Sequence, residues 1–199
     1  DATSDHRSAL QAPKAQARTS LNIPPDAFVG LLPGTVIDRK SQIDLVHAVR
    51  QLDLDVVRNL HLIILGDRPT PYSEALHREI GSLDPLRQHC LSVLPYAAGA
   101  EQYFRAADFL ISTSRIEAFP RVIQEAMFFE VPMIVAPVYG IVEQVNDEVS
   151  ALFFPPGDAA RLAQQIERLF WCSALRERLA ANARVTLDRF PTVNEMVAF

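Results

Sequence analysis

Two glutamates, Glu117 and Glu125, lie eight positions apart around Pro120, where a helix is expected to begin. A proline suits the first helical turn, because a backbone N–H there has no partner within the helix. Glu117 is then expected in the loop before the helix, and Glu125 about one and a half turns inside it. The backbone N–H groups from Arg121 onward would form an anion site. Carboxylates that bind hydroxyls beside a helix end that binds phosphate would suit a sugar nucleotide.

The spacing alone leaves a second interpretation open, since glutamates near a helix start usually complement the helix dipole or are simply solvated. Lysine usage draws attention to another position. The chain has 17 arginines but only two lysines, Lys14 and Lys40. Arg39 and Lys40 could form the solvated start of the next helix, so their position in the fold decides between the two interpretations.

Composition excludes several classes of protein. With 199 residues, 49% of them hydrophobic, the chain can bury one good core. A net charge of −5 gives no electrostatic footprint for nucleic acid or for an anionic membrane. The longest uncharged apolar run, 131–142, is too short to span a bilayer and contains two prolines and a glycine. The first residues do not resemble a signal peptide, so a cytoplasmic location is the default.

Metal and disulfide chemistry have no sequence signal. Cys90 and Cys172 are isolated in the sequence, which indicates neither a disulfide framework nor a zinc site. The five histidines form no i, i+4 pair of the kind that binds a metal. We therefore expect no metal site.

Short apolar runs alternate with amphipathic stretches along the chain. Most of the apolar runs are continuous, as expected for parallel strands covered on both faces. A strand followed by a helix, repeated about six times, predicts a doubly wound α/β domain with a parallel sheet. The expected strands are 28–32, 60–65, 90–94, 109–112, 133–136 and 151–154. The expected helices are 18–22, 42–52, 74–80, 101–106, 120–130, 141–146, 159–169 and 175–188.

Domain limits and helix ends follow from the same pattern. Residues 1–22 read as a linker or tail with a short helix, and residues 23–190 read as one domain. Ser41 and Asp158 are expected to cap the helices that follow them. Gly81 is expected to end the helix at 74–80.

Candidate site residues follow four of the expected strands. In open parallel sheets ligands bind outside the carboxyl ends of the strands. The segments at those ends are 34–40, 66–68, 95–96 and 113–117. Lys40 and the Glu117–Glu125 element should therefore share one edge of the sheet, where a lysine and a helix N-terminus could hold a diphosphate. Gly34 could instead be only a turn glycine.

Several familiar sites are absent from the sequence. No G-x-G-x-x-G follows the first strand, so a dinucleotide site would lack its pyrophosphate turn. The chain has no Walker-type Gly-Lys-Ser/Thr loop and no Gly-x-Ser-x-Gly elbow.

The combined pattern resembles the retaining glycosyltransferases of the GT-B fold, family 4 in particular (glycosyl transferases group 1). The resemblance covers roughly 23–199. The motifs that carry it, in the family's order, are Gly34-Thr35, Lys40 and Gln42, Ala107-Asp108, Glu117-x7-Glu125 with Ala126-Met127 and Pro132, Tyr139-Gly140 with Glu143, and Phe154-Pro155-Pro156-Gly157-Asp158.

The resemblance implies a Rossmann-like sheet of about six parallel strands with helices on both faces, the C-terminal, donor-binding half of a GT-B enzyme. It also implies that residues 191–199 start a crossover segment. The N-terminal acceptor domain of the same polypeptide would be missing, so that the fragment alone is inactive. Any membrane association would come through that domain, and polysaccharide or glycolipid biosynthesis would be the setting.

The resemblance also assigns roles to residues. Glu125 would bind the ribose hydroxyls, Glu117 would contact hydroxyls of the donor sugar, and Lys40 would neutralise the diphosphate. The backbone at Phe119, Pro120 and Arg121 would hold the distal phosphate. Such enzymes need no metal or other cofactor, because positive side chains and a helix dipole take its place.

Two positions depart from the family pattern. The family often has an arginine directly after the first-strand glycine, and this chain has Thr35 there, so Arg39 is a candidate to compensate. A flexible Gly-Phe-Gly is common after the first glutamate, and Ala118-Phe119-Pro120 replaces it.

The resemblance implies transfer of a hexosyl group from a nucleotide diphosphate sugar to a hydroxyl acceptor, with retention at the anomeric carbon. Glycoside hydrolysis by the paired carboxylates is a weaker alternative, because Glu125 would face the nucleoside. A non-catalytic nucleotide-sugar-binding or interaction module is another. A third is a GT-B epimerase of nucleotide sugars, which would require acid/base groups such as histidines at the mouth of the site.

Overall fold

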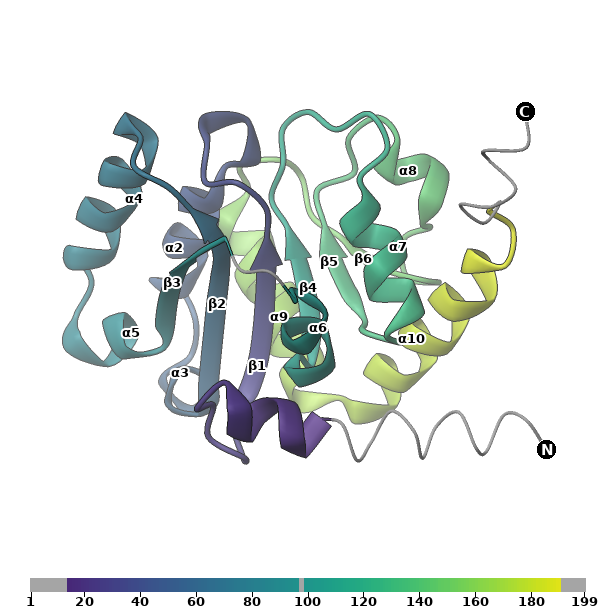
Figure 1. The fold of residues 1–199 in the computed structure, drawn as a ribbon, viewed down its shortest axis with the longest axis horizontal. Helices are drawn as coiled ribbons and strands as arrows, with labels where there is room; N and C mark the ends of the chain where they lie inside the picture. The colour runs from purple at the N-terminus through teal and green to yellow at the C-terminus, as the bar shows by residue number, and fades with distance from the viewer. Residues whose placement is uncertain (1–13, 97–98, 191–199) are drawn as a thin grey trace.

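The computed structural model describes residues 14–96 and 99–190, which form a six-stranded sheet with helices around it (Figure 1). Every pair of neighbouring strands is parallel, and the strand order is β3-β2-β1-β4-β5-β6. The predicted Rossmann-like α/β sheet is thus confirmed. The strands are β1 (Phe28–Pro33), β2 (Leu60–Asp67), β3 (Leu91–Pro95), β4 (Phe109–Ser112), β5 (Met133–Val135) and β6 (Leu152–Phe153).

Helices cover both faces of this sheet (Figure 1). One face packs against α2 (Gln42–Val49), α3 (Leu54–Asn59), α4 (Pro71–Gly81) and α9 (Ala159–Trp171). The opposite face packs against α6 (Glu101–Ala106), α7 (Arg121–Phe128) and α8 (Ile141–Gln144). Other helices include α5 (Pro85–His89), the 3-10 turn η1 (Asp38–Lys40) and α10 (Ser173–Leu187), which contributes to both cores.

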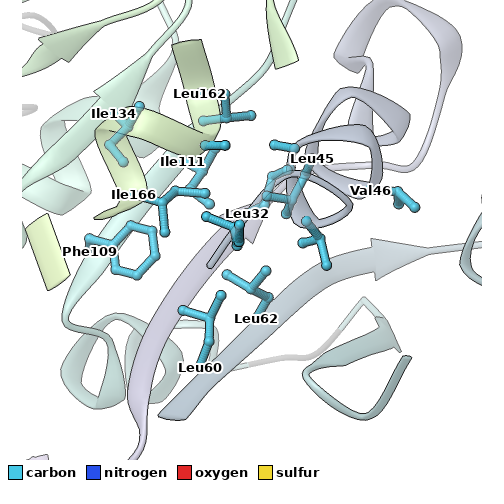
Figure 2. Packing of buried hydrophobic residues seen from close by; sticks show 14 of the residues in the cluster. Leu32, Leu45, Val46, Leu60, Leu62, Phe109, Ile111, Ile134, Leu162 and Ile166 are labelled. Atoms are coloured by element: carbon cyan, nitrogen blue, oxygen red, sulfur yellow. The ribbon is translucent and has the colours of Figure 1, made fainter. Parts of the chain in front are cut away.

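The two cores explain why the strands are continuous apolar runs. Successive side chains of a strand point to opposite faces. In β1, Phe28 and Leu32 join the core that includes α2 and α9, while Val29 and Leu31 join the core on the other face. Figure 2 shows the first of these cores, with Leu32 beside Leu62, Leu45 and Ile166. Because each face has its own helices, β1 carries apolar residues throughout, and all of them are buried.

Gly30, in the middle of β1, makes room for an aromatic ring. It pairs in register with Phe109 of β4, and a Cβ added at Gly30 would lie 2.5 Å from the ring of Phe109 and 2.6 Å from Leu62. The ring of Phe109 also stacks on Phe28, with 4.8 Å between centroids. A side chain at position 30 would displace this ring and with it the pairing of β1 and β4.

The structure differs from the sequence predictions mainly at helix ends. The two unexpected helices, α3 and α5, are each capped by an aspartate: Asp53 accepts from Asp55 N–H, and Asp84 accepts from Arg87 N–H. The helix expected at 74–80 begins earlier, at Pro71, because Thr70 is its N-cap and accepts from Ser73 N–H. Local capping groups therefore start helices that hydrophobic periodicity alone does not reveal.

Two further predicted helices are shifted. Residues 14–20 are helical, rather than 18–22. Helix α7 begins at Arg121, so Pro120 is its N-cap and not its first helical residue. Asp158 caps α9 as predicted, by accepting from Arg161 N–H at 2.8 Å.

The residues just before Ile23 take part in the fold. Arg18 is buried and donates to Ala106 O at 3.1 Å and to Asp108 Oδ2 at 2.6 Å. Ala17 belongs to the core that includes α6 and α7. The parts of the predicted tail and crossover at 1–13 and 191–199 lie outside the described residues.

Candidate functional site

The sheet has a switch point between β1 and β4, which are neighbours although two strands separate them in the sequence. The chain leaves β1 toward α2 on one face of the sheet and leaves β4 toward α7 on the other face. The two connections therefore diverge above the carboxyl ends of these strands. Such a crevice is where open α/β sheets bind ligands.

The connection after β1 is fixed to the end of β2 by two glycines with positive φ. Gly34 has φ +130 and Gly66 has φ +121, and a Cβ at Gly66 would lie 2.6 Å from Gly34 O. Gly34 N–H donates to Leu65 O at 2.8 Å, and Val36 N–H donates to Gly66 O at 3.1 Å. A side chain would be strained at both positions because of the positive φ, and at Gly66 it would also block the close approach.

Lys40 lies over Gly34 and contacts Glu117. A Cβ at Gly34 would be 3.6 Å from Lys40 Nζ. The Lys40 ammonium donates to Glu117 Oε1, which also accepts from Ser114 Oγ at 2.8 Å. Both charged side chains are largely buried, with 13% of Lys40 and 9% of Glu117 exposed. The fold thus joins two candidates that are 77 positions apart in the sequence.

Two neighbours complete this cluster. Thr113 Oγ1 donates to Lys40 O at 2.6 Å and anchors its backbone. The Arg39 guanidinium lies 3.8 Å from Glu117 Oε2 and is about half exposed. Thr35, next to Gly34, is partly buried, and its carbonyl accepts from the Gln42 amide at 3.0 Å. Two cations and one carboxylate leave the cluster with a net positive charge, which suits a phosphate group.

The start of α7 holds the other candidates. Pro120 is the N-cap and has no side-chain hydrogen bond to the helix, so among the described residues no side chain caps the first N–H groups. Glu125 is 40% exposed, and its ion-pair partner is Arg121 of the same helix, at 3.9 Å. Phe119 is partly exposed, and its ring packs edge-to-face with that of Phe190, with 5.6 Å between the ring centroids. The structure therefore joins Glu117, but not Glu125, to Lys40.

The loop before α7 is supported by Gly140, which lies just before α8. A Cβ at Gly140 would overlap the carbonyl of Ala118, and Gly140 N–H donates to Glu117 O at 3.4 Å. The sequence marked Gly140 only as a position in the family order. Its physical role, contact with the backbone beside Glu117, needed the fold.

Asp67 belongs to the segment 66–68 that the sequence places at this edge of the sheet, but its hydrogen-bond partners were not predicted. Asp67, at the end of β2, accepts from Ser73 Oγ at 2.6 Å, and its other oxygen lies 3.0 Å from His77 Nε2. Partial burial favours the neutral carboxyl of Asp67, but the hydrogen bonds from Ser73 and His77 outweigh it and lower its pKa. The four-residue spacing of Ser73 and His77 on one helix was the available signal.

Two searches of the described residues gave no site. Within 14–96 and 99–190, no group of three or more His, Cys, Asp or Glu residues could hold a metal ion. No helix in that part of the chain is long and apolar enough to cross a membrane.

Known proteins are similar to this chain in sequence and in fold. The chain is 32% identical over 183 residues to D-inositol 3-phosphate glycosyltransferase of Salinispora arenicola (strain CNS-205), covering 86% of this chain and 40% of the relative. It is 32% identical over 172 residues to the lipopolysaccharide core biosynthesis glycosyltransferase LpsD of Rhizobium meliloti (strain 1021), covering 86% of this chain and 47% of the relative. The chain thus spans less than half the length of these relatives.

Among solved structures, Anabaena Alr3699/HepE in complex with UDP and glucose is similar, with a TM-score of 0.83 and 26% identity over 94% of this chain and 51% of that one. Residues 13–186 match the family described as Glycosyl transferases group 1. That match covers most of the chain and includes every candidate residue at the switch point. The chain therefore belongs to the glycosyl transferases group 1 family, whose GT-B fold its parallel sheet shares.

Proposed function

We propose that this chain is the donor-binding domain of a retaining, family 4 glycosyltransferase. The enzyme would move a hexosyl group from a nucleotide diphosphate sugar to a hydroxyl acceptor. The observation that carries the proposal is the Lys40 ammonium held beside Glu117 at the switch point. The similarity to a structure that contains UDP and glucose supports the same ligand class.

In the proposed reaction, the bond between the anomeric carbon and the distal phosphate oxygen breaks, and its electron pair leaves with the diphosphate. The acceptor oxygen forms the new bond to the same face of the sugar, and its proton passes to the departing diphosphate oxygen. Negative charge develops on the diphosphate as the bond breaks. Lys40 and Arg39 would stabilise that charge, together with the N–H groups at the start of α7. Arg39 would thereby take the part of the family arginine that Thr35 replaces.

The two glutamates would then have separate tasks. Glu117 is fixed by Lys40 and Ser114, so it can present a carboxylate oxygen to hydroxyls of the donor sugar. Glu125 is partly exposed on the first turns of α7 and would bind the ribose hydroxyls. The backbone of Phe119, Pro120 and Arg121 would hold the distal phosphate. No metal or other cofactor is needed in this proposal, since the cations and the helix end supply the positive charge.

The rest of the proposal concerns the whole protein. An N-terminal acceptor domain of the same polypeptide would supply the acceptor site, and the chain alone would not transfer the sugar. Association with a membrane would come through that domain, and the donor domain would face the cytoplasm. Such an enzyme would serve polysaccharide or glycolipid biosynthesis.

A thermal-shift panel tests the proposal on this chain. UDP, GDP and ADP, each with and without a hexose, are added to the wild type and to Lys40→Ala. A ligand that binds only the folded state raises the unfolding temperature. We expect one nucleotide series to stabilise the wild type and to lose most of its effect with Lys40→Ala. If no nucleotide or nucleotide sugar shifts the wild type, the proposal is wrong.

Product analysis of the full-length protein separates the alternatives. Transfer gives a glycoside and a free nucleoside diphosphate. An epimerase changes the sugar, and a binding module leaves the donor intact. Appearance of the nucleoside diphosphate only when a hydroxyl acceptor is present would support the transferase.

A further inference from the structure

Arg115, two residues before Glu117, contacts the segment that carries Lys40. Its backbone N–H donates to Arg39 O at 2.8 Å, one residue before the point where Thr113 holds Lys40 O. Thr113 is fully buried at the end of β4. The β4 connection therefore binds the peptide carbonyls on both sides of the Lys40 Cα atom.

The Arg115 side chain extends this contact to the start of α2. Its Nε donates to Ser41 Oγ at 2.9 Å, and one terminal nitrogen lies 3.0 Å and 3.2 Å from the two oxygens of Asp44. Asp44 is buried in the first turn of α2. The Arg115 guanidinium thus connects Ser41, the residue after Lys40, to Asp44 in α2.

Ser41 is the residue that most needs such a contact. Its backbone has φ 48 and ψ 41, a left-handed conformation that residues other than glycine rarely adopt. Its side chain does not cap α2, contrary to the sequence prediction, but accepts from Arg115 instead. This turn sets the direction in which the chain leaves Lys40.

The guanidinium itself is held by a third segment. Gly157 has φ +85, and a Cβ there would lie 2.9 Å from one terminal nitrogen of Arg115. The backbone of Gly157 therefore packs directly against the guanidinium. Arg115 connects the loops after β1, β4 and β6 at one place.

We propose that Arg115 is a positioning residue, which holds the left-handed turn at Ser41 so that Lys40 points at the distal phosphate of a nucleoside diphosphate. The inference rests on the proposed function, because it assigns that phosphate to Lys40. Lysine at position 115 offers one compact ammonium and could not contact Ser41 and Asp44 in the same planar geometry.

The test compares a nucleoside diphosphate with its monophosphate, which lacks the phosphate that Lys40 would bind. UDP/UMP, GDP/GMP and ADP/AMP serve as probes, and the pair that binds the wild type is used in calorimetric titrations. Arg115→Lys and Arg115→Ala should weaken diphosphate binding about tenfold, comparable to a lost charge-assisted hydrogen bond. Monophosphate binding should stay within about twofold, since the nucleoside contacts are unchanged.

A double-mutant cycle identifies the route of the effect. If Arg115 acts through Lys40, Arg115→Ala should cause no further loss of diphosphate affinity in a Lys40→Ala background. Arg168→Ala is the matched control. Arg168 also binds both oxygens of one carboxylate, that of Glu148, but on α9 and away from the switch point. It should lower the unfolding temperature without changing diphosphate affinity.

Three results would overturn the inference while leaving the proposed function standing. They are unchanged diphosphate affinity in both Arg115 variants, an equal loss for diphosphate and monophosphate, and effects that add to that of Lys40→Ala. Arg115→Lys keeps the test available if Arg115→Ala does not fold. A wild type that binds none of the six probes would instead reject the proposed function, and this inference with it.

Discussion

Glu117 and Glu125 belong to the same loop–helix junction, but their surroundings differ. Glu117 is buried, and Lys40, Ser114 and Arg39 all approach its carboxylate. Glu125 is 40% exposed, and its partner is Arg121, itself 87% exposed. An exposed pair at 3.9 Å contributes little to stability, whereas a buried charge needs its partner.

This difference distinguishes a side chain that the protein itself holds in place from one that a bound ligand would have to position. The position of Glu117 is set by the fold, through contacts that join β1 to β4. The position of Glu125 is set only by its helix, so its side chain can adapt to a bound group. Preorganisation of charge is most valuable where charge changes during a reaction. The comparison therefore supports the proposal that Glu117 lies at the reacting end of the donor and that Glu125 only binds it.

Lys40→Ala should have the largest effect. Loss of the ammonium should weaken diphosphate binding about 10- to 100-fold, the range for a hydrogen bond between charged groups. It should also lower stability, because Glu117 would keep a buried carboxylate without this partner. Calorimetry and thermal unfolding measure the two effects.

The control for Lys40→Ala is the other lysine. Lys14 pairs with Asp108 at 2.6 Å, just before β4 and therefore at the opposite edge of the sheet. Lys14→Ala should leave diphosphate affinity unchanged. Equal losses in the two variants would contradict a specific role for Lys40.

Glu125→Ala should weaken nucleotide binding about tenfold, through lost hydrogen bonds to the ribose. Stability should change by less than about 0.5 kcal/mol, because the side chain is exposed. The sharper measurement uses the 2′-deoxy nucleotide. The wild type should bind it more weakly than the ribonucleotide, and Glu125→Ala should bind both alike.

Glu74→Ala, an exposed glutamate in the first turn of α4, is the matched control. It should leave the preference for the ribonucleotide intact. A preference that survives in Glu125→Ala would show that the ribose contact lies elsewhere.

Glu117→Gln should act in the opposite direction on diphosphate binding. Removing the negative charge beside Lys40 should raise affinity for the free nucleoside diphosphate about fivefold, the effect of one like charge about 4 Å away when water screens the repulsion. Turnover by the full-length protein should fall, since the carboxylate no longer fixes the donor sugar. Weaker diphosphate binding in this variant would contradict the proposal that Glu117 lies beside the bound diphosphate.

The smallest effect expected is a pH dependence of stability at Asp44. Burial raises the pKa of this carboxyl above its ordinary value of 3.8, and the Arg115 guanidinium offsets this only in part. The folded state therefore binds the proton more tightly than the unfolded state. The resulting stability is fully present below pH 3.8 and is lost as the pH rises through the folded pKa.

Asp67 should show the reverse sign, because its pKa is lowered. Its contribution is present above the ordinary value and is lost as the pH falls through the folded pKa. Urea unfolding between pH 3 and pH 7, about the range in which carboxyls titrate, compares the wild type with Asp44→Asn and Asp67→Asn. For each substitution, the difference in unfolding free energy from the wild type is plotted against pH. Slopes of the same sign for the two substitutions would contradict this account.

The parallel sheet and the placement of Lys40 and Glu117 at one edge of it could be anticipated from the sequence, whereas their direct contact needed the structure. Apolar runs mark buried strands, and strand ends meet at one edge of a parallel sheet. The start of α4 directly after its N-cap Thr70 could not be anticipated, and neither could the helices α3 and α5. Short capped segments have too little hydrophobic periodicity to be recognised. The role of Arg115, within the candidate segment 113–117, was also missed, because its partners Ser41 and Asp44 lie more than 70 positions away in the sequence.

The close backbone contact between Gly34 and Gly66 has a consequence for engineering. The exits of β1 and β2 touch through their backbones, so neither loop can be exchanged without the other. A graft that takes the β2 exit from a relative must keep glycine at both positions, or the segment with Lys40 will shift. Any exchange of the segment after β2 should therefore transplant the segment after β1 with it, as one unit.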